Sequence, residues 1–261
     1  MNSPLAMIFS SSSSLISILF YGLAITCLTS ATVSASYGGN ETDYLALLSF
    51  KSTVTHDPHK VLTSWNHSLH FCEWSGNLSF LRTLSIRNNS FQGTIPHELG
   101  RLSRLRHLYL NRNKFSGVIP TNLSGCSNLE DLWPNENMLA GSIPKEMSLL
   151  SKLVGLGIHN NKLTGGIPPF LGNITSMETF SATTNPFGGS IPDTLGLWKS
   201  LREFDVGECN LYGSIPHSIF NLSLLVNLSL AENHLTGSLP SEIGPIPDAI
   251  GNLSLLIELY L

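Results

Sequence analysis

Few residue pairs in this sequence have the types and spacing that catalysis needs. Ser142 and Lys145 form a Ser-x-x-Lys pair, in which a lysine could activate a serine nucleophile. The same segment is one copy of a Gly-x-Ile-Pro turn that recurs along the chain, and so short a motif needs its own structural context to be catalytic. We therefore predict an ordinary turn here, and a chain that has no catalytic residues.

The other residues that could do chemistry are scattered. The nine His residues show no metal-ligand spacing, and His56 and His59 are expected beside a solvated turn. The sequence contains no phosphate loop, no kinase signature and no His-Glu-x-x-His zinc motif. A formal net charge of −4 without Lys/Arg runs argues against a nucleic-acid partner. We predict a chain that is not an enzyme and needs no metal or cofactor.

The N-terminus resembles a secretory signal. Residues 15–28 are largely apolar, and Val33-Ser34-Ala35 offers small residues for cleavage, so residues 1–35 are predicted to be a signal peptide. Because no Lys or Arg precedes the apolar run, an uncleaved signal anchor is the alternative. No second apolar stretch of about 20 residues follows it.

Asn-x-Ser/Thr sequons are frequent and support export. On the secretory route each is an acceptor for N-linked glycan, and together they predict a heavily glycosylated surface. The predicted sites are Asn40, Asn66, Asn77, Asn88, Asn122, Asn173, Asn221, Asn227 and Asn252.

A 24-residue repeat dominates the chain. The Gly-x-Ile/Leu-Pro turn recurs seven times between Gly93 and Pro240, always at this spacing. A second ladder runs beside it, formed by Asn89, Asn113, Asn137, Asn161, Asn185, Cys209 and Asn233. A fixed period of this length predicts a solenoid, in which stacked coils share one continuous core.

Each repeat position has a physical role. Leu-x-x-Leu-x-Leu predicts a short strand with its leucines pointing inward, and seven such strands should stack into one sheet. The Asn amide that follows can bond backbone groups inside the coil, and the Gly allows a tight bend. Three residues break the pattern: Pro134 cannot donate to the ladder, Cys209 is a weak substitute for Asn, and Cys126 fills an apolar slot.

The repeat Leu-x-x-Leu-x-Leu-x-x-Asn-x-Leu-x-Gly-x-Ile-Pro, over residues 77–261, resembles the plant-specific leucine-rich repeats. These repeats occur in ectodomains of plant receptor-like kinases and receptor-like proteins, and in polygalacturonase-inhibiting proteins. Residues 41–51, 62–65 and 72–74 resemble the N-terminal cap of those ectodomains. Thr42 or Asp43 can cap a helix there, in which leucines and Phe50 follow helical spacings.

The resemblance implies an α/β solenoid: a right-handed, horseshoe-type leucine-rich-repeat superhelix. A parallel sheet would line its concave face and a helix would cap its N-terminal end. We divide the chain into a signal peptide (1–35), an incomplete cap (36–76) and a solenoid of seven full repeats and a partial eighth (77–261).

Two junctions depart from the family pattern. The second cysteine of the cap is absent after Cys72, and Gly244-Pro245-Ile246-Pro247 follows the seventh turn too early. Natural variation of end units and a truncated or misassembled gene product are the two explanations. Cys72 is expected to carry a free thiol or to link two chains, and the strand around Leu259 to expose an apolar edge.

Outward residues of the strands are the candidate ligand-binding residues, because they alternate with the core leucines. Tyr109 and Trp133 should be exposed aromatics on adjacent coils, and the face should turn from basic in units one and two to acidic in units three and six. A peptide with ordered charges could be read along such a gradient. The candidates are Arg87, His107, Tyr109, Asn111, Arg112, Asp131, Trp133, Asn135, His159, Thr183, Glu203 and Asp205.

The function implied by the resemblance is extracellular recognition of a ligand or co-receptor by a plant cell-surface receptor, with no catalysis by this chain. The partners would be a peptide or protein ligand and possibly a co-receptor. A membrane would be involved only through C-terminal parts outside this sequence or an uncleaved signal. The expected location is the apoplast, or the cell surface within a longer receptor. The alternatives are a soluble inhibitor of a secreted pathogen cell-wall enzyme and a non-functional truncated product.

Overall fold

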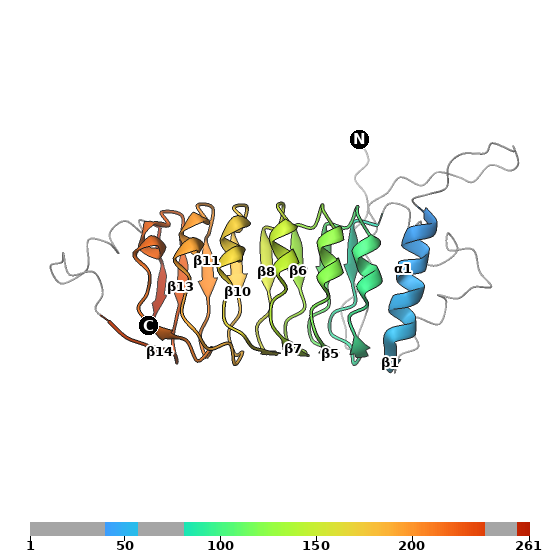
Figure 1. The fold of residues 1–261 in the computed structure, drawn as a ribbon, viewed down its shortest axis with the longest axis horizontal. Coiled ribbons are helices and arrows are strands. Elements are labelled where there is room, and N and C mark those ends of the chain that lie inside the picture. The colour runs from blue at the N-terminus through green and yellow to red at the C-terminus, as the bar shows by residue number, and fades with distance from the viewer. Residues whose placement is uncertain (1–39, 57–80, 238–254) are drawn as a thin grey trace, which may run out of the picture.

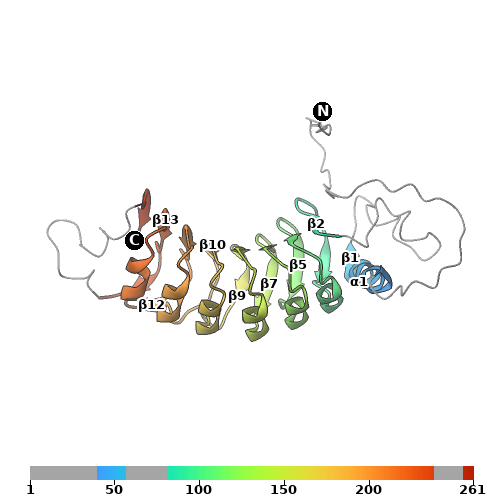
Figure 2. The ribbon, with the colours of Figure 1, turned by 90° about the horizontal axis from the view of Figure 1, so that it is seen from above.

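The computed structural model describes residues 40–56, 81–237 and 255–261 of the chain. They form an elongated stack of coils with a helix beside the first coil, and the stack bends into a shallow arc (Figures 1 and 2). The expectations for the signal peptide, for Cys72 and for the sequons at Asn66, Asn77 and Asn252 lie outside these residues.

The cap begins with helix α1 (Asn40–Thr53), which continues into strand β1 (Val54–His56). Ala46, Leu47 and Phe50 are buried, and the Phe50 ring lies 6.1 Å from that of Phe115 in the second coil. The predicted N-cap at Thr42 or Asp43 is wrong, because the helix already includes both residues. His56 is exposed, as expected, but it ends strand β1, which pairs antiparallel with β3, and the turn expected between it and His59 lies outside the described residues.

Eight short parallel strands form the sheet on the inner side of the arc, where Figure 2 shows them opposite the coiled segments. Neighbouring strands pair in register, so that Leu84 faces Leu108 and Leu132 faces Leu156. The strands are β2 (Thr83–Ser85), β4 (His107–Tyr109), β6 (Asp131–Trp133), β8 (Gly155–Gly157), β10 (Thr179–Ser181), β11 (Glu203–Asp205), β13 (Asn227–Ser229) and β15 (Glu258–Tyr260).

The eighth strand, β15, is the one expected around Leu259 in the partial eighth repeat, and it joins the sheet beside the seven other strands. Asn227 of β13 faces Glu258 of β15, which lies 31 residues later in the chain. The two paired residues are therefore farther apart in the sequence than the 24-residue period of the other units. Leu259 in this strand is 37% exposed, consistent with the apolar edge expected there.

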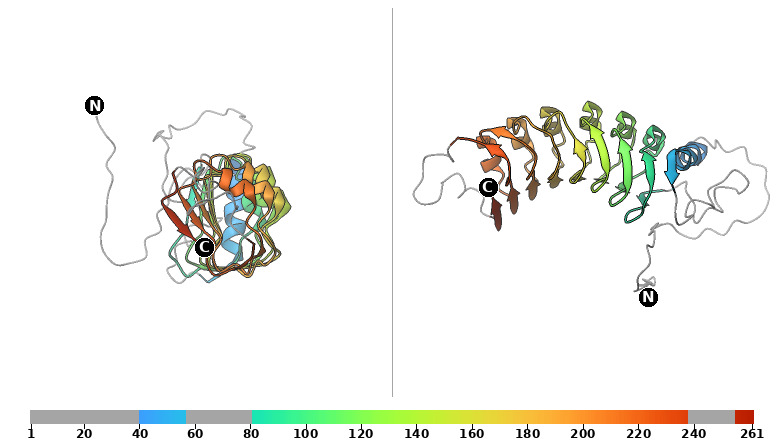
Figure 3. Two further views of the ribbon diagram at one scale, coloured as in Figure 1. Left: turned by 90° about the vertical axis from the view of Figure 1, so that its left-hand side faces the viewer. Right: turned by 90° about the horizontal axis from the view of Figure 1, so that it is seen from below.

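The outer side of the arc carries one five-residue 3-10 helix per coil, each beginning directly after the Pro of the repeat turn. Seen along the stack, these helices superimpose on the side opposite the strands (Figure 3). They are η3 (His97–Arg101), η4 (Thr121–Gly125), η5 (Lys145–Leu149), η6 (Pro169–Asn173), η7 (Asp193–Leu197) and η8 (His217–Asn221).

A second row of strands, which the sequence did not predict, links the two sides of most coils but is absent from the fifth. It forms one sheet in the order β1-β3-β5-β7-β9 and a separate pair, β12-β14. The bend after these strands uses the repeat glycine, with φ of 79° at Gly117 and Gly141. The remaining strands are β3 (Gln92–Thr94), β5 (Lys114–Gly117), β7 (Met138–Gly141), β9 (Lys162–Leu163), β12 (Tyr212–Gly213) and β14 (His234–Leu235).

The asparagine ladder joins consecutive coils, as predicted. The Asn161 amide nitrogen donates to the carbonyls of Ile158 (3.1 Å) and His159 (3.2 Å), and to Pro134 of the preceding coil (3.2 Å). Its amide oxygen accepts the backbone N–H of Leu139, also in the preceding coil, at 2.9 Å. One side chain thus satisfies four backbone groups, three of them in buried bonds, that no regular ladder reaches.

The irregular residues behave as the sequence indicated. Pro134 cannot donate, and the β6–β8 pairing has two registered residue pairs where most neighbouring strands have three. The Cys126 and Cys209 thiols are fully buried. Burial raises the pKa of Cys209 to about 12, so this thiol stays protonated. Within the residues that are described, no helix is both long and apolar enough to cross a bilayer.

Candidate ligand-binding face

The fourth strand of the inner sheet has no side chains on its concave side. Gly155 and Gly157 occupy the outward positions of β8, and Trp133 of β6 lies across both of them. A Cβ added to Gly157 would come within 2.1 Å of Trp133 Cε3, and one added to Gly155 would lie 3.3 Å from its Nε1. The indole therefore rests flat on the β8 backbone, which leaves its other face toward the groove.

Trp133 and Tyr109 lie opposite each other on adjacent coils, as predicted, but they are half-buried rather than exposed. Their burial has two causes. Trp133 packs on the glycine backbone of β8, and the Tyr109 hydroxyl donates to Asp131 Oδ2 at 3.2 Å. Both rings are therefore held in fixed orientations before any ligand arrives.

Asp131 lies between these two rings. Its Oδ2 contacts His107 Nδ1 at 2.8 Å, and its Oδ1 is 3.5 Å from Trp133 Nε1. Burial and then the Asp131 carboxylate raise the pKa of Tyr109 to about 12, so the phenol remains a hydrogen-bond donor. The Arg87 guanidinium lies over the Tyr109 ring, with Cζ 6.0 Å from the ring centroid.

In the third unit, which the sequence predicted to be acidic, two carboxylates are paired with arginines of the second unit. Arg106 Nη1 lies 2.9 Å from Glu130 Oε1, and Arg112 Nε lies 3.0 Å from Glu136 Oε1. Each pair joins the second coil to the third, so the basic and acidic units that the sequence presents in succession neutralise each other across one strand spacing.

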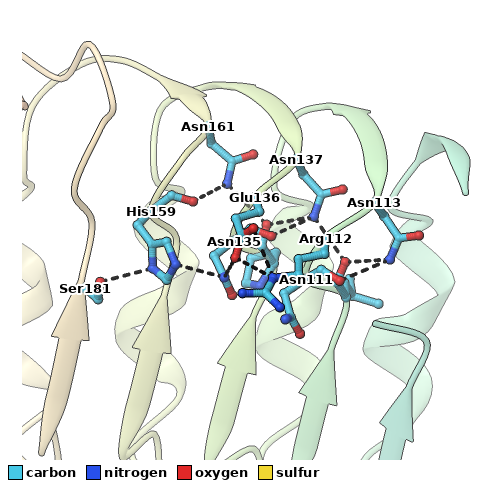
Figure 4. A network of polar contacts seen from close by, with 11 residues as sticks. Asn111, Arg112, Asn113, Asn135, Glu136, Asn137, His159, Asn161 and Ser181 are labelled. Atoms are coloured by element: carbon cyan, nitrogen blue, oxygen red, sulfur yellow. Dashed lines mark hydrogen bonds and ion pairs between the residues drawn. The ribbon is translucent and has the colours of Figure 1, made fainter. Parts of the chain in front are cut away.

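A polar network crosses the third, fourth and fifth coils just beyond the strands (Figure 4). The Asn135 amide nitrogen lies 3.3 Å from Glu136 Oε1 and 2.9 Å from His159 Nε2, and His159 Nδ1 lies 3.0 Å from Ser181 Oγ. Since the amide nitrogen can only donate, His159 accepts at Nε2 and donates from Nδ1, which is the neutral form. Burial lowers the pKa of His159, which agrees with that form.

Asn135 itself is not on the exposed face, which corrects its place among the outward residues. It is 4% exposed, because its amide is turned into the network beside His159. Two serines at outward strand positions, Ser85 and Ser181, are likewise buried. Asn111 and Thr183 are half-buried at the rim of the sheet, and Arg112 is exposed there.

Acidic residues gather at the C-terminal end of the face. Glu203 and Asp205 project from β11, and Glu258 follows on β15. Burial and then the charges of Asp205 and Glu258 raise the pKa of Glu203. The nearby Arg202 lies 4.0 Å from Glu178 on the preceding coil. This end matches the acidic sixth unit that the sequence predicted.

The sequons divide between the two sides of the arc. Asn122, Asn173 and Asn221 are exposed on the outer 3-10 helices, where a glycan would leave the concave face open. Asn88 is exposed beyond β2, whereas Asn227 lies on β13 with its amide nitrogen 3.3 Å from Glu258 Oε2. Asn40 is the first residue of α1. Glycosylation at these sites stays a prediction.

No group of three or more His, Cys, Asp or Glu side chains within the described ranges is arranged to hold a metal ion. Ser142 and Lys145 lie on the turn into η5, with Lys145 exposed on the outer side. That the chain lacks catalytic activity stays a prediction.

Two family models match the chain and together cover more than half of it. The model of the leucine-rich-repeat N-terminal domain matches residues 40–76. The model of the leucine-rich repeat matches residues 80–102, 104–126, 152–174, 200–222 and 224–253. The intervening units, including the third with Trp133 and Pro134, continue the same strand register.

Curated relatives are plant receptor kinases. The chain is 40% identical to the LRR receptor-like serine/threonine-protein kinase EFR of Arabidopsis thaliana, over 24% of this chain and 9% of that protein. It is 38% identical to the putative receptor-like protein kinase At3g47110 of the same plant, over 22% of this chain and 8% of the relative. The match thus spans less than a tenth of either relative.

Solved structures with the same fold include plant receptor ectodomains. The complex of PEPR1 with AtPEP1 matches with a TM-score of 0.77 and 32% identity, over 85% of this chain and 31% of that one. The ectodomain of the Arabidopsis receptor kinase HAESA, bound to an IDA peptide hormone, matches with a TM-score of 0.69 and 30% identity, over 86% and 41%.

Proposed function

From the premise that this chain is a leucine-rich-repeat protein with the cap and repeats of plant receptor ectodomains, we propose that it recognises a peptide or protein ligand along its concave sheet. In this proposal it is the extracellular recognition part of a cell-surface receptor, and it binds without chemical change to the ligand. Signalling depends on other parts of a longer protein or on a co-receptor.

The observation that carries this proposal is the preorganised surface over β4, β6 and β8. The Trp133 indole lies on the backbone of Gly155 and Gly157, which we call the glycine floor. The Asp131 carboxylate has donor groups of His107, Tyr109 and Trp133 around it. The neighbouring carboxylates are paired with arginines of the adjacent coil. Side chains fixed in this way lose little conformational entropy on binding, which is the main cost for a flexible surface. Aromatic residues and arginine are also the types enriched at binding hot spots.

The similar structures support the same use of the fold. PEPR1 is in complex with AtPEP1, and HAESA has been solved with the peptide hormone IDA and the co-receptor SERK1. A peptide that lies along the sheet of the present chain would cross an aromatic and charge-paired region first and an acidic region afterwards. We propose that this order of chemistry selects the ligand.

The proposal is tested by selecting ligands with the secreted protein. The full chain is expressed in plant cells, immobilised and panned against a displayed library of random peptides. Selected peptides should compete with one another, and they should lose affinity for a Trp133→Ala variant but not for a variant on the outer side, Lys145→Ala. Peptides that bind both variants equally well would place recognition elsewhere and overturn the proposal.

A further inference from the structure

Asp131 differs from the other carboxylates of the third coil in its partners. Glu130 and Glu136 each have an arginine of the second coil within 3.0 Å. Among the residues that the structure describes, the one ion-pair contact of Asp131 is with His107, at 2.8 Å, and this counts as an ion pair only when the imidazole is protonated. No arginine or lysine of the described residues therefore forms an ion pair with Asp131.

The surroundings of this carboxylate are aromatic. The Tyr109 hydroxyl donates to Oδ2 at 3.2 Å, while Oδ1 has its nearest donor, Trp133 Nε1, at the long distance of 3.5 Å. The side chain of Asp131 is 26% exposed. Oδ1 therefore keeps acceptor capacity above Gly155, where no side chain covers it, directly beside the edge of the indole.

The Trp133 indole beside Asp131 offers a flat surface that is held against the backbone of β8. One face of Trp133 lies on the backbone of Gly155 and Gly157, and these glycines place no side chain over or beside the ring. Tyr109 shows that rings on this face can hold a guanidinium, since Arg87 lies 6.0 Å from its centroid. Arg106 and Arg112 are paired with Glu130 and Glu136, so neither balances Asp131.

We propose that Asp131 and Trp133 form a subsite for an arginine side chain of the ligand. The guanidinium stacks on the open face of the indole and donates N–H groups to Asp131 Oδ1. Arginine fits better than lysine because its planar, weakly hydrated cation can stack and donate in a fixed fork at once. The subsite rests on the proposed function, since it names one side chain that the ligand of the concave face presents.

The test uses a small probe rather than the unknown ligand. A capped tripeptide, acetyl-Gly-Arg-Gly-amide, is titrated into the full chain, and binding is followed by NMR through the indole N–H signals. We expect a Kd on the order of millimolar, and binding roughly tenfold weaker when citrulline replaces arginine, because citrulline keeps the shape but loses the charge. The lysine peptide should bind with intermediate strength.

Matched variants locate the probe. Asp131→Asn keeps the shape of the side chain and should weaken the arginine probe about tenfold, whereas Asp193→Asn removes an exposed acid on the outer side and should change nothing. Trp133→Phe, which retains a ring, should weaken binding less than Trp133→Leu. Thermal unfolding of each variant verifies that the fold is intact.

Three results would overturn the subsite. They are the absence of detectable binding of the arginine probe, equal binding of arginine and citrulline peptides, and loss of binding on Glu203→Gln but not on Asp131→Asn. The last would place the cation at the acidic end of the face. If the arginine probe fails while library-selected peptides still depend on Trp133, the subsite is wrong and the proposed function stands.

Discussion

The two halves of the concave sheet have the same backbone and different electrostatics. Between β2 and β8, Glu130 and Glu136 are paired with arginines of the neighbouring coil, as Arg112 is with Glu136 at 3.0 Å. From β10 to β15, Glu203 is near two other acids, which together with burial raise its pKa. The strand register is shared by both halves, so the difference comes entirely from outward residues.

This contrast shows how the repeat separates folding from recognition. Inward leucines and the ladder asparagines fix the coil and recur at every period. Outward positions are not fixed by the core in this way. Whether an outward charge is paired depends on the residue at the equivalent position of the adjacent coil. Glu130 and Glu136 of the third coil are paired because the second coil supplies arginines, whereas Glu203 of the sixth coil has two acids near it instead. The predictions below test this separation, beginning with the shared framework.

The largest effect is expected from the ladder. Asn161→Ala removes the partner of four backbone groups, three of them in buried bonds, and should lower the free energy of unfolding by about 3 kcal/mol, because unpaired buried polar groups lose their solvation. Urea unfolding monitored by circular dichroism measures the loss. Asn111→Ala, at a half-buried outward position, is the control and should cost less than 1 kcal/mol. A similar cost for both variants would contradict the separation of roles.

The glycine floor should give the next largest effect, and only in the N-terminal half. A Cβ at Gly157 would overlap Trp133 Cε3, so Gly157→Ala should destabilise the protein by about 2 kcal/mol. In a Trp133→Ala background the same substitution should cost much less, because the overlap is gone. A double-mutant cycle measures this coupling. Additive costs in the cycle would mean that Trp133 does not depend on the floor.

Acid should weaken the N-terminal half through His159. Burial lowers the pKa of His159 in the folded chain, partly opposed by Glu136 and Asp205 and reinforced by Arg112. The unfolded chain therefore binds the proton more readily, and stability should fall as the pH decreases below about 6.5, the ordinary histidine value. Above that pH the residue should make no pH-dependent contribution. His159→Gln should flatten this part of the curve of unfolding free energy against pH, and an unchanged slope would exclude the mechanism.

The smallest effect is expected at the acidic end. The pKa of Glu203 is raised, so the folded chain holds its proton more tightly than the unfolded chain does, and stability is lost as the pH rises from the ordinary glutamate value through the raised one. Glu203→Gln should therefore stabilise the protein at pH 7 by a few tenths of a kcal/mol, and less in acid. Chemical denaturation at both pH values measures the difference. Destabilisation at pH 7 would mean that a cation already balances this end.

The periodic part of the fold could be predicted from the sequence because each inward residue acts locally. Leucine spacing indicated the strands, the Asn ladder indicated the bonds between coils, and Pro134 correctly indicated a weakened pairing. The second row of strands could not be predicted, since residues such as Gln92 and Thr94 show no apolar alternation. Strand β1 was not predicted, because it pairs with β3, whose residues lie more than 30 positions later in the sequence.

The candidate face was predicted by position but not by chemistry. Alternation placed Tyr109 and Trp133 correctly on adjacent strands. Their burial depends on residues one coil away, namely Asp131 for Tyr109 and the two β8 glycines for Trp133. Comparing positions 24 residues apart, rather than neighbours in sequence, would have indicated the Arg112–Glu136 pairing and the space that Trp133 fills.

The affinity of one selected peptide for a matched pair of variants tests the central claim most directly. Calorimetry with wild type, Trp133→Ala and Lys145→Ala compares the concave face with the outer side. We predict that Trp133→Ala weakens binding by about 2 kcal/mol and that Lys145→Ala changes it by less than 0.5 kcal/mol. Equal affinities of wild type and Trp133→Ala, together with a clear loss for Lys145→Ala, would contradict recognition by the concave sheet.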